Sequence, residues 1–151
     1  MKIYIASSWK NVDLVRALAD HLRSRGHLVY DFTDGENRPD GLGTFVFNAS
    51  ELLGMDRSKI DWLEFLEHPA TKKAFKNDKA GIDWADLLIL INPSGRSSHL
   101  EAGYAAGKGK RVLVYGDLPP GEFDVMYLLA GGHYRLGDHD GLLAGIGGAS
   151  K

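Results

Sequence analysis

The densest group of residues that could do chemistry lies between positions 92 and 107. It reads Asn-Pro-Ser-Gly-Arg-Ser-Ser-His-Leu-Glu-Ala-Gly-Tyr-Ala-Ala-Gly. Small residues and free backbone N–H groups at a helix start can hold an anion or a sugar oxygen, and the carboxylate of Glu101 could act as a nucleophile. Ser98 and Glu101 also have the S-x-x-E spacing of a capping box, in which the glutamate only bonds back to the helix cap. From the residues alone, a catalytic role and a capping role for Glu101 are therefore equally supported.

Strand and helix patterns alternate along the chain and predict how this segment is positioned. We expect strands at 2–6, 28–32, 87–91 and 112–115, and a weaker fifth strand at 133–136. We expect helices between the N-cap Asn11 and the stop at Gly26, and at 58–66, 70–85, 100–106 and 122–129. Gly81 interrupts and weakens the predicted helix 70–85, and the glycine-rich residues 141–151 are expected to fray.

Short apolar strands that alternate with helices predict an α/β fold. The specific expectation is a doubly wound three-layer sandwich with a parallel five-stranded sheet in flavodoxin-like order. No repeat or linker interrupts the pattern, so residues 1–151 are expected to form one domain. Ligands of such sheets bind beyond the carboxyl ends of the strands, which here are Ser7-Ser8-Trp9, the loop after Phe32, and 92–101.

Composition excludes several classes of protein. The net charge is −2 and no long Lys/Arg block occurs, which argues against nucleic-acid binding. The chain has no cysteine, and its 6 histidines lack metal-ligand spacing, so neither a metal site nor a disulfide framework is expected. The longest aliphatic run, 87–91, is too short to cross a membrane, and the first residues do not resemble a signal peptide. We therefore expect a cytoplasmic protein.

Three blocks of sequence, in order, resemble the nucleoside 2-deoxyribosyltransferase family. They are Ile-Tyr-Ile-Ala at 3–6, Phe-Lys-Asn-Asp-Lys-Ala-Gly-Ile-Asp-Trp-Ala-Asp-Leu-Leu-Ile at 75–89, and Glu-Ala-Gly-Tyr-Ala-Ala-Gly-Lys-Gly-Lys-Arg-Val-Leu-Val-Tyr at 101–115. The segment 33–74 and the C-terminal tail match poorly. The resemblance implies cleavage of the N-glycosidic bond of a 2′-deoxynucleoside through a covalent glutamyl sugar, followed by transfer of the sugar to another nucleobase. It implies no cofactor.

The resemblance also implies roles for particular residues. Glu101 matches the nucleophile, Asp78 matches the position that contacts the base and is our expected proton donor, and Tyr4 matches a tyrosine that orients the nucleophile. Ser7 and Ser8 follow the strand that carries Tyr4 and are expected to bind substrate, and Trp9 matches an aromatic residue beside the base. From the residues alone, Asp78 would be a solvated helix residue, Tyr4 a packing residue and Trp9 a lid over the core.

The chain departs from the family in the loop before the nucleophile. Ser94-Gly95-Arg96-Ser97-Ser98 contains no acid where the bacterial transferases carry an aspartate that recognises the base. The related nucleoside 5′-monophosphate N-glycosidases hold phosphate with serines and N–H groups in this loop, and Arg96, Ser97 and Ser98 suit that role. Gly95 of the same loop is also expected to bind substrate. A hydrolase acting on nucleotides is therefore the alternative function, and a non-catalytic nucleotide-sensing module is a third possibility.

A further segment, Phe123 to Met126, resembles the one that a subunit of the family lends to its neighbour's site. Asp124 and Met126 are therefore expected to bind substrate in a homodimer or higher homo-oligomer with shared active sites. A carboxylate at Asp124 would repel a phosphate dianion by about 4 kcal/mol per charge pair at close range, which favours nucleosides if it reaches the site. The expected partners are a nucleoside or nucleotide and a nucleobase, with no nucleic acid and no membrane.

Overall fold

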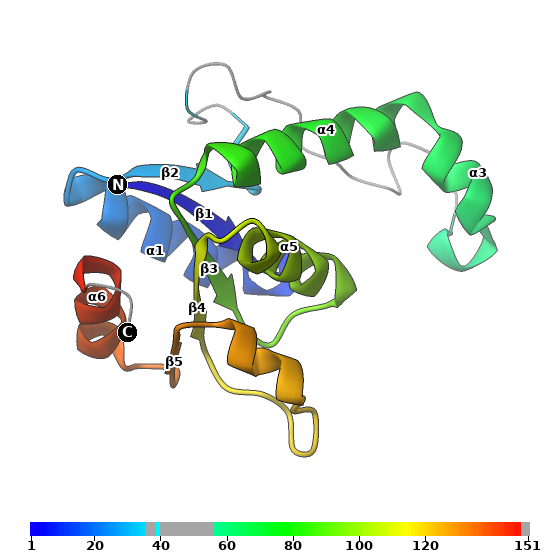
Figure 1. Cartoon of the computed structure of the whole chain (residues 1–151). Coiled ribbons are helices and arrows are strands. Elements are labelled where there is room, and N and C mark those ends of the chain that lie inside the picture. The colour runs from blue at the N-terminus through cyan, green and yellow to red at the C-terminus, as the bar shows by residue number, and fades with distance from the viewer. Residues whose placement is uncertain (36–38, 40–55, 149–151) are drawn as a thin grey trace.

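Five parallel strands form the centre of the fold (Figure 1). The computed structural model describes residues 1–35, 39 and 56–148. The strands are β1 (Lys2–Ala6), β2 (Leu28–Asp31), β3 (Leu87–Ile91), β4 (Arg111–Tyr115) and β5 (Gly132–Tyr134). They lie in the order β2-β1-β3-β4-β5, and each neighbouring pair is parallel. The flavodoxin-like order predicted from the alternating pattern is confirmed.

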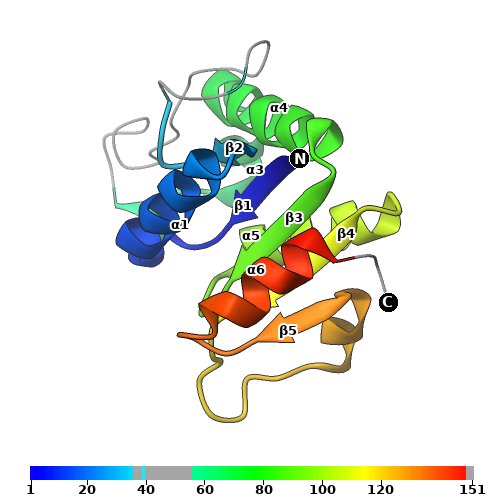
Figure 2. The same cartoon turned by 90° about the vertical axis from the view of Figure 1, so that its left-hand side faces the viewer.

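Helices cover both faces of this sheet, which makes a three-layer sandwich (Figures 1 and 2). α1 (Val12–Ser24) and α6 (His139–Gly147) pack on one face, whereas α4 (Pro69–Trp84) and α5 (Arg96–Gly107) pack on the other. The shorter elements are α3 (Trp62–Glu67) and the 3₁₀ turns η1 (Trp9–Asn11), η2 (Arg57–Lys59) and η3 (Val125–Leu129). None of the helices in the described part of the chain is long and apolar enough to cross a membrane.

Side chains of β1 alternate between the two layers, as a strand requires. Ile3 and Ile5 join the core under α1 and α6, whereas Tyr4 and Ala6 join the core under α4 and α5. The unbroken apolar run of β3 is buried at every residue because helices cover both of its faces. This alternation places the hydroxyl-bearing ring of Tyr4 in the layer that also holds α4 and α5.

The start of α5 differs from the prediction. The helix begins at Arg96 rather than at residue 100, so Glu101 lies in its second turn. Gly95 is the N-cap, and the buried Ser98 hydroxyl donates a 3.0 Å hydrogen bond to the Gly95 carbonyl oxygen. The capping-box interpretation of Ser98 and Glu101 is therefore wrong, and the Glu101 carboxyl is not used to close the helix end.

Gly81 does not interrupt α4, which continues from Pro69 to Trp84. A Cβ atom at Gly81 would lie 2.9 Å from Cδ2 of Tyr30 and 3.0 Å from Cε2 of Tyr4. The glycine thus lets the helix backbone approach two aromatic rings of the sheet. Pro69 occupies the first turn of α4, where its missing N–H costs no hydrogen bond, so the chain turns between α3 and α4 at this point.

Two further elements differ from expectation. The predicted helix 122–129 is the 3₁₀ turn η3, capped by the Asp124 side chain. The expected frayed tail instead forms α6 up to Gly147, with Leu142 and Ile146 buried in the core. Arg111 of β4 also donates hydrogen bonds to the carbonyl oxygens at the end of α6. Tertiary contacts therefore stabilise this glycine-rich helix. The predicted loop at 33–43 lies mostly outside the described residues.

Candidate active site

Three predicted catalytic residues, each from a different element, gather on the α4/α5 face of the sheet. Tyr4 comes from β1, Asp78 from α4 and Glu101 from α5. The Tyr4 ring is fully buried and stacks on Tyr30 with 4.8 Å between ring centroids. The Tyr30 hydroxyl in turn donates a 2.8 Å hydrogen bond to Asp78. The two stacked tyrosine rings therefore form the buried surface against which the two carboxyl groups lie.

Glu101 is strongly perturbed by this environment. Burial is the main cause and the negative charge of Asp78 is the second, and together they raise the Glu101 pKa from 4.5 to about 8. The hydroxyls of Tyr4 and Ser97 act in the opposite direction, and the Ser97 oxygen lies 3.5 Å from the carboxyl oxygen. At neutral pH the Glu101 carboxyl therefore carries its proton.

Tyr4 is the group placed to interact with that carboxyl. Burial, followed by the charges of Glu101 and Asp78, raises the pKa of Tyr4 well above its usual 10, so the phenol keeps its proton. Its hydroxyl oxygen is buried and has no hydrogen-bond partner of standard geometry among the described residues. A buried donor without a partner is costly, so this hydroxyl can donate to Glu101 or to a ligand once either approaches.

The arrangement is suited to acid–base and nucleophilic chemistry. The charge of Asp78 disfavours ionisation of the Glu101 carboxyl, so the two groups favour opposite protonation states. One member can supply a proton to a leaving group while the other carries the negative charge. Within the described part of the chain, no three His, Asp or Glu side chains converge as metal ligands would.

The first edge segment, after β1, is mainly structural. The Ser7 hydroxyl donates to the Ile91 carbonyl oxygen at 2.9 Å and accepts a 3.0 Å bond from the Asn11 amide. Ser8 caps η1 by accepting from the Lys10 N–H. Both serine hydroxyls that we predicted to bind substrate are thus engaged within the chain. The Trp9 side chain, in contrast, is 47% exposed and can contact a ligand.

Asn11 and Trp9 connect this segment to the other edge segments. Asn11 donates a 2.7 Å hydrogen bond to the Pro93 carbonyl oxygen, which ties the loop after β1 to the loop after β3. The Trp9 ring lies edge-on to Phe32, with 5.2 Å between centroids. Sequence reasoning assigned Asn11 only to helix capping, although its side chain makes no cap hydrogen bond there.

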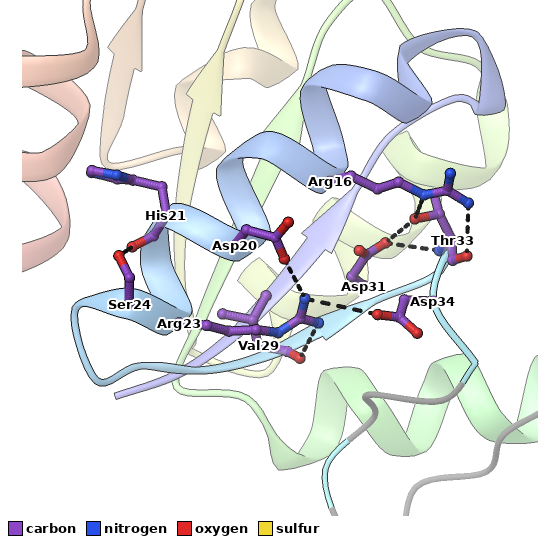
Figure 3. A network of polar contacts seen from close by, with 9 residues as sticks. All are labelled: Arg16, Asp20, His21, Arg23, Ser24, Val29, Asp31, Thr33 and Asp34. Carbon is purple, nitrogen blue, oxygen red and sulfur yellow. Dashed lines mark hydrogen bonds and ion pairs between the residues drawn. The ribbon is translucent and has the colours of Figure 1, made fainter.

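A polar network fixes the carboxyl end of β2 against α1 (Figure 3). The buried Asp31 carboxylate accepts hydrogen bonds from the Thr33 N–H and hydroxyl at 2.8 and 2.7 Å. Arg16 donates to the same threonine, and Arg23 donates to the Val29 carbonyl oxygen. These contacts anchor the start of the loop after Phe32, which is the second predicted edge segment.

The α5 N-terminus is the part of the loop 92–98 best exposed to a ligand. No side chain of the described residues caps it at Gly95, and Gly95, Arg96 and Ser97 are exposed. Ser97 therefore stays available as predicted, whereas Ser98 is buried and bonded to Gly95. The N–H groups of an uncapped helix end favour an anion or a sugar oxygen.

Asp124 and Met126, the two predicted substrate-binding residues of the η3 region, lie away from the carboxyl pair. They line a cavity of about 380 Å³ between η3, the sheet and α5, together with His99 and Tyr127. None of the described lining residues is Tyr4, Asp78 or Glu101. The single chain therefore does not bring the predicted substrate residues of η3 to the carboxyl pair.

The chain matches no protein-family model and no curated protein. Among solved structures, it is similar to a 2-deoxyribosyltransferase from Bacillus psychrosaccharolyticus, with 22% identity and a TM-score of 0.53 over 88% of this chain and 85% of that one. It is also similar to the CMP N-glycosidase BcmB from Clostridium botulinum, with 15% identity and a TM-score of 0.55 over 97% and 99% of the two chains. Both are of the kinds that the sequence motifs resemble, so the resemblance is confirmed at the level of the fold.

Proposed function

We propose that this protein cleaves the N-glycosidic bond of a 2′-deoxynucleoside and transfers the sugar to another nucleobase. The observation that carries the proposal is the coupled pair of Glu101 and Asp78 above the buried Tyr4 hydroxyl. The shared fold of the two solved structures, one a deoxyribosyltransferase and one a nucleotide N-glycosidase, supports it.

The reaction proceeds through two displacements at C1′ of the sugar. A Glu101 oxygen bonds to C1′ while the C1′–N bond breaks, and the electron pair of that bond goes to the base nitrogen, which takes a proton from Asp78. The second base then attacks C1′ through a ring nitrogen, returns the electron pair to Glu101 and gives its proton back to Asp78. Two displacements retain the configuration at C1′.

The position of the Glu101 proton decides when Glu101 can attack. At neutral pH the proton rests on Glu101, because its pKa is about 8. The reacting state needs the charge on Glu101 and the proton at the base. Positive charge that develops at C1′ stabilises the Glu101 carboxylate, and the Tyr4 hydroxyl donates to it, so the proton moves toward Asp78 and the leaving base.

A nucleoside 5′-monophosphate N-glycosidase is the second candidate, and the α5 N-terminus favours it. The helix end is uncapped, with Arg96 and Ser97 exposed beside it, which suits a phosphate. Asp124 would repel a phosphate but lines a different cavity within the chain. Water in place of the second base would then hydrolyse the glycosyl-enzyme.

A substrate screen distinguishes these candidates. The protein is incubated with deoxynucleosides and their 5′-monophosphates, each with and without a different free base, and products are separated by chromatography. An exchanged nucleoside supports the transferase, and free base released from monophosphates supports the hydrolase. Product that persists in Glu101→Ala refutes the assigned nucleophile. Ligand-induced thermal stabilisation without turnover would instead identify a binding module.

We also propose that the protein forms a homo-oligomer through η3. Five apolar side chains of this region are exposed in the single chain, and they are Phe123, Val125, Met126, Leu128 and Leu129. Exposed apolar patches of this kind mark interaction sites. Light scattering after gel filtration should give a mass of at least twice 16.5 kDa, and Leu128→Glu should shift it toward the monomer. A monomeric wild type would refute this arrangement.

A further inference from the structure

We propose that His99 is a positioning residue for the active site, because its ring connects the loop before α5 to η3. The inference rests on the proposed function for its kinetic consequence, but its structural part stands on hydrogen bonds of the described residues. The His99 Nδ1 atom lies 2.8 Å from the Gly95 carbonyl oxygen, and its Nε2 atom lies 2.6 Å from the Tyr127 hydroxyl.

The chemistry of these partners defines the tautomer of His99. A carbonyl oxygen only accepts hydrogen bonds, so Nδ1 must carry the proton that is donated to Gly95. In the neutral ring Nε2 is then an acceptor, and the Tyr127 hydroxyl donates to it. The Asn92 amide lies 3.5 Å from the Tyr127 oxygen and donates at long range. A directional series of hydrogen bonds thus runs from Asn92 through Tyr127 and His99 to Gly95.

The two ends of this series matter to the site for different reasons. Gly95 is the N-cap of α5 and lies two residues before Ser97, whose hydroxyl contacts Glu101. Asn92 is buried at the end of β3, where its oxygen accepts a bond from Ser94. The His99 ring therefore binds one end of the loop 92–95 directly and the other end through Tyr127.

The same ring holds η3 against the body of the protein. Tyr127 is partly buried, whereas Val125, Met126, Leu128 and Leu129 of the same turn are exposed. His133 contacts the Tyr127 carbonyl oxygen at 2.7 Å from the β5 side. These two histidines fix η3, and with it Asp124, whose carboxylate caps the turn at the Met126 N–H.

His99 itself does not touch the carboxyl pair. Residues 99 and 101 are separated by about 200° around a helix, and His99 lines the cavity beneath η3, whose described lining does not include Glu101. Its effect on a substrate must act through the loop and η3. We therefore expect changes at His99 to alter KM more than kcat.

Two conservative variants separate the two bonds of the ring. In His99→Asn the amide nitrogen replaces Nδ1 and keeps the bond to Gly95, whereas in His99→Gln the amide oxygen replaces Nε2 and keeps the bond to Tyr127. Each variant should raise KM for the deoxynucleoside about fivefold, the effect of one lost neutral hydrogen bond, with kcat within about twofold. Tyr127→Phe removes the same bond as His99→Asn, so their combination should be no worse than either alone. His21→Asn, on the opposite helical layer, is the matched control.

Amide hydrogen exchange and NMR test the structural part without any turnover. The ¹⁵N shifts of His99 should show a protonated Nδ1 and an unprotonated Nε2, and the amides of 94–98 should exchange faster in both His99 variants than in His21→Asn. An unchanged KM, with or without a lower melting temperature, would reduce His99 to a packing residue and overturn the inference. If no nucleoside is cleaved, the proposed function fails, and unchanged exchange at 94–98 would independently overturn the role of His99.

Discussion

The hydroxyl of Tyr30 donates a 2.8 Å hydrogen bond to Asp78, which joins β2 to the pair of carboxyl groups, Asp78 and Glu101. Tyr30 is fully buried and stacks on Tyr4 with an interplanar angle of only 10°. The orientation of Asp78 therefore depends on the packing of two core rings. The electrostatics of Glu101 depend on the same core, because Asp78 raises its pKa.

Replacing Glu101 by Gln should abolish cleavage and stabilise the fold. The folded-state pKa of Glu101, about 8, lies above its ordinary value of 4.5. Its carboxyl is neutral in both states below pH 4.5, and stability is lost as the pH rises from there to about 8. The glutamine avoids this loss, so we expect Glu101→Gln to be more stable by roughly 4 kcal/mol at pH 8 and by almost nothing at pH 4.

Thermal unfolding across this pH range measures the effect. A gain of this size corresponds to a melting temperature roughly 10 °C higher at pH 8. A pH-independent difference between the wild type and Glu101→Gln would contradict the raised pKa.

Asp78→Asn should lower the pKa of Glu101. The variant removes the like charge that disfavours ionisation, so the Glu101 carboxyl should titrate at a lower pH, and general-acid catalysis should fall by roughly 10²-fold or more. Titration of the Glu101 ¹³Cδ shift measures the pKa directly. Asp83→Asn is the matched control, since Asp83 also lies on α4 but pairs with Lys79 at 2.8 Å. An equal shift in both variants would point to a general charge effect instead of a specific pair.

Tyr4→Phe and Tyr30→Phe should separate chemistry from stability. The buried Tyr4 hydroxyl has no hydrogen-bond partner of standard geometry among the described residues, so its loss should leave the free energy of unfolding unchanged or raise it by up to about 2 kcal/mol. The Tyr30 hydroxyl bonds to a carboxylate, and its loss should cost about 2 kcal/mol. Tyr4→Phe should nonetheless raise the Glu101 pKa and lower kcat at pH 7, because that hydroxyl lowers the pKa. Denaturant unfolding and steady-state kinetics on the two variants test this prediction. A full kcat in Tyr4→Phe would contradict it.

Gly81→Ala should damage both the fold and the site. Its methyl group would meet the stacked rings of Tyr30 and Tyr4 at 2.9 and 3.0 Å, and such overpacking costs about 1 to 3 kcal/mol. Gly107→Ala, at the end of α5, is the control because a Cβ there meets nothing within 4 Å of the described atoms. Urea unfolding should show a lower midpoint for Gly81→Ala only. Equal stability of the two variants would show that α4 can move away from the rings.

Ser97→Ala should alter substrate binding, whereas Ser98→Ala should alter the stability of the fold. Ser97 is exposed and contacts Glu101, so its loss should alter KM or the preference between nucleoside and monophosphate while leaving stability unchanged. Ser98 is buried and bonded to Gly95, so its loss should cost about 1 kcal/mol of stability. Steady-state kinetics and thermal melting on both variants test this, and the reverse pattern would contradict the assignment.

Sequence patterns predict the strands well because period-two alternation and the apolar run 87–91 are local signals. The gathering of Tyr4, Asp78 and Glu101 follows from the family resemblance together with the rule that parallel strands end at one edge. Local signals were misleading where a residue's partner is distant. Ser98 fits a capping pattern, but its hydroxyl bonds to the Gly95 carbonyl oxygen. Gly81 suggests a break in the helix, whereas in the structure it allows the helix to approach the rings of Tyr30 and Tyr4.

Long-range partners account for the remaining differences. Tyr30 and Asp78 are separated by 48 residues, and no periodicity connects them. His99 and Tyr127 are separated by 28 residues. His99 lies just outside the predicted helix 100–106, and Tyr127 lies in the predicted helix 122–129, which is the 3₁₀ turn η3. The α6 helix forms despite its glycines, because burial of Leu142 and Ile146 outweighs its poor intrinsic propensity.

The division of the sandwich into two helical layers has a practical consequence. The carboxyl pair and its tyrosines belong to the layer of α4 and α5, whereas α1 lies on the opposite face of the sheet (Figure 2). Ala17 is exposed on α1, and the native chain contains no cysteine. A cysteine introduced at Ala17 would thus be the sole thiol of the protein. Through it the chain can be immobilised or carry a fluorophore in one defined orientation, with the whole thickness of the sheet between the attachment point and Glu101.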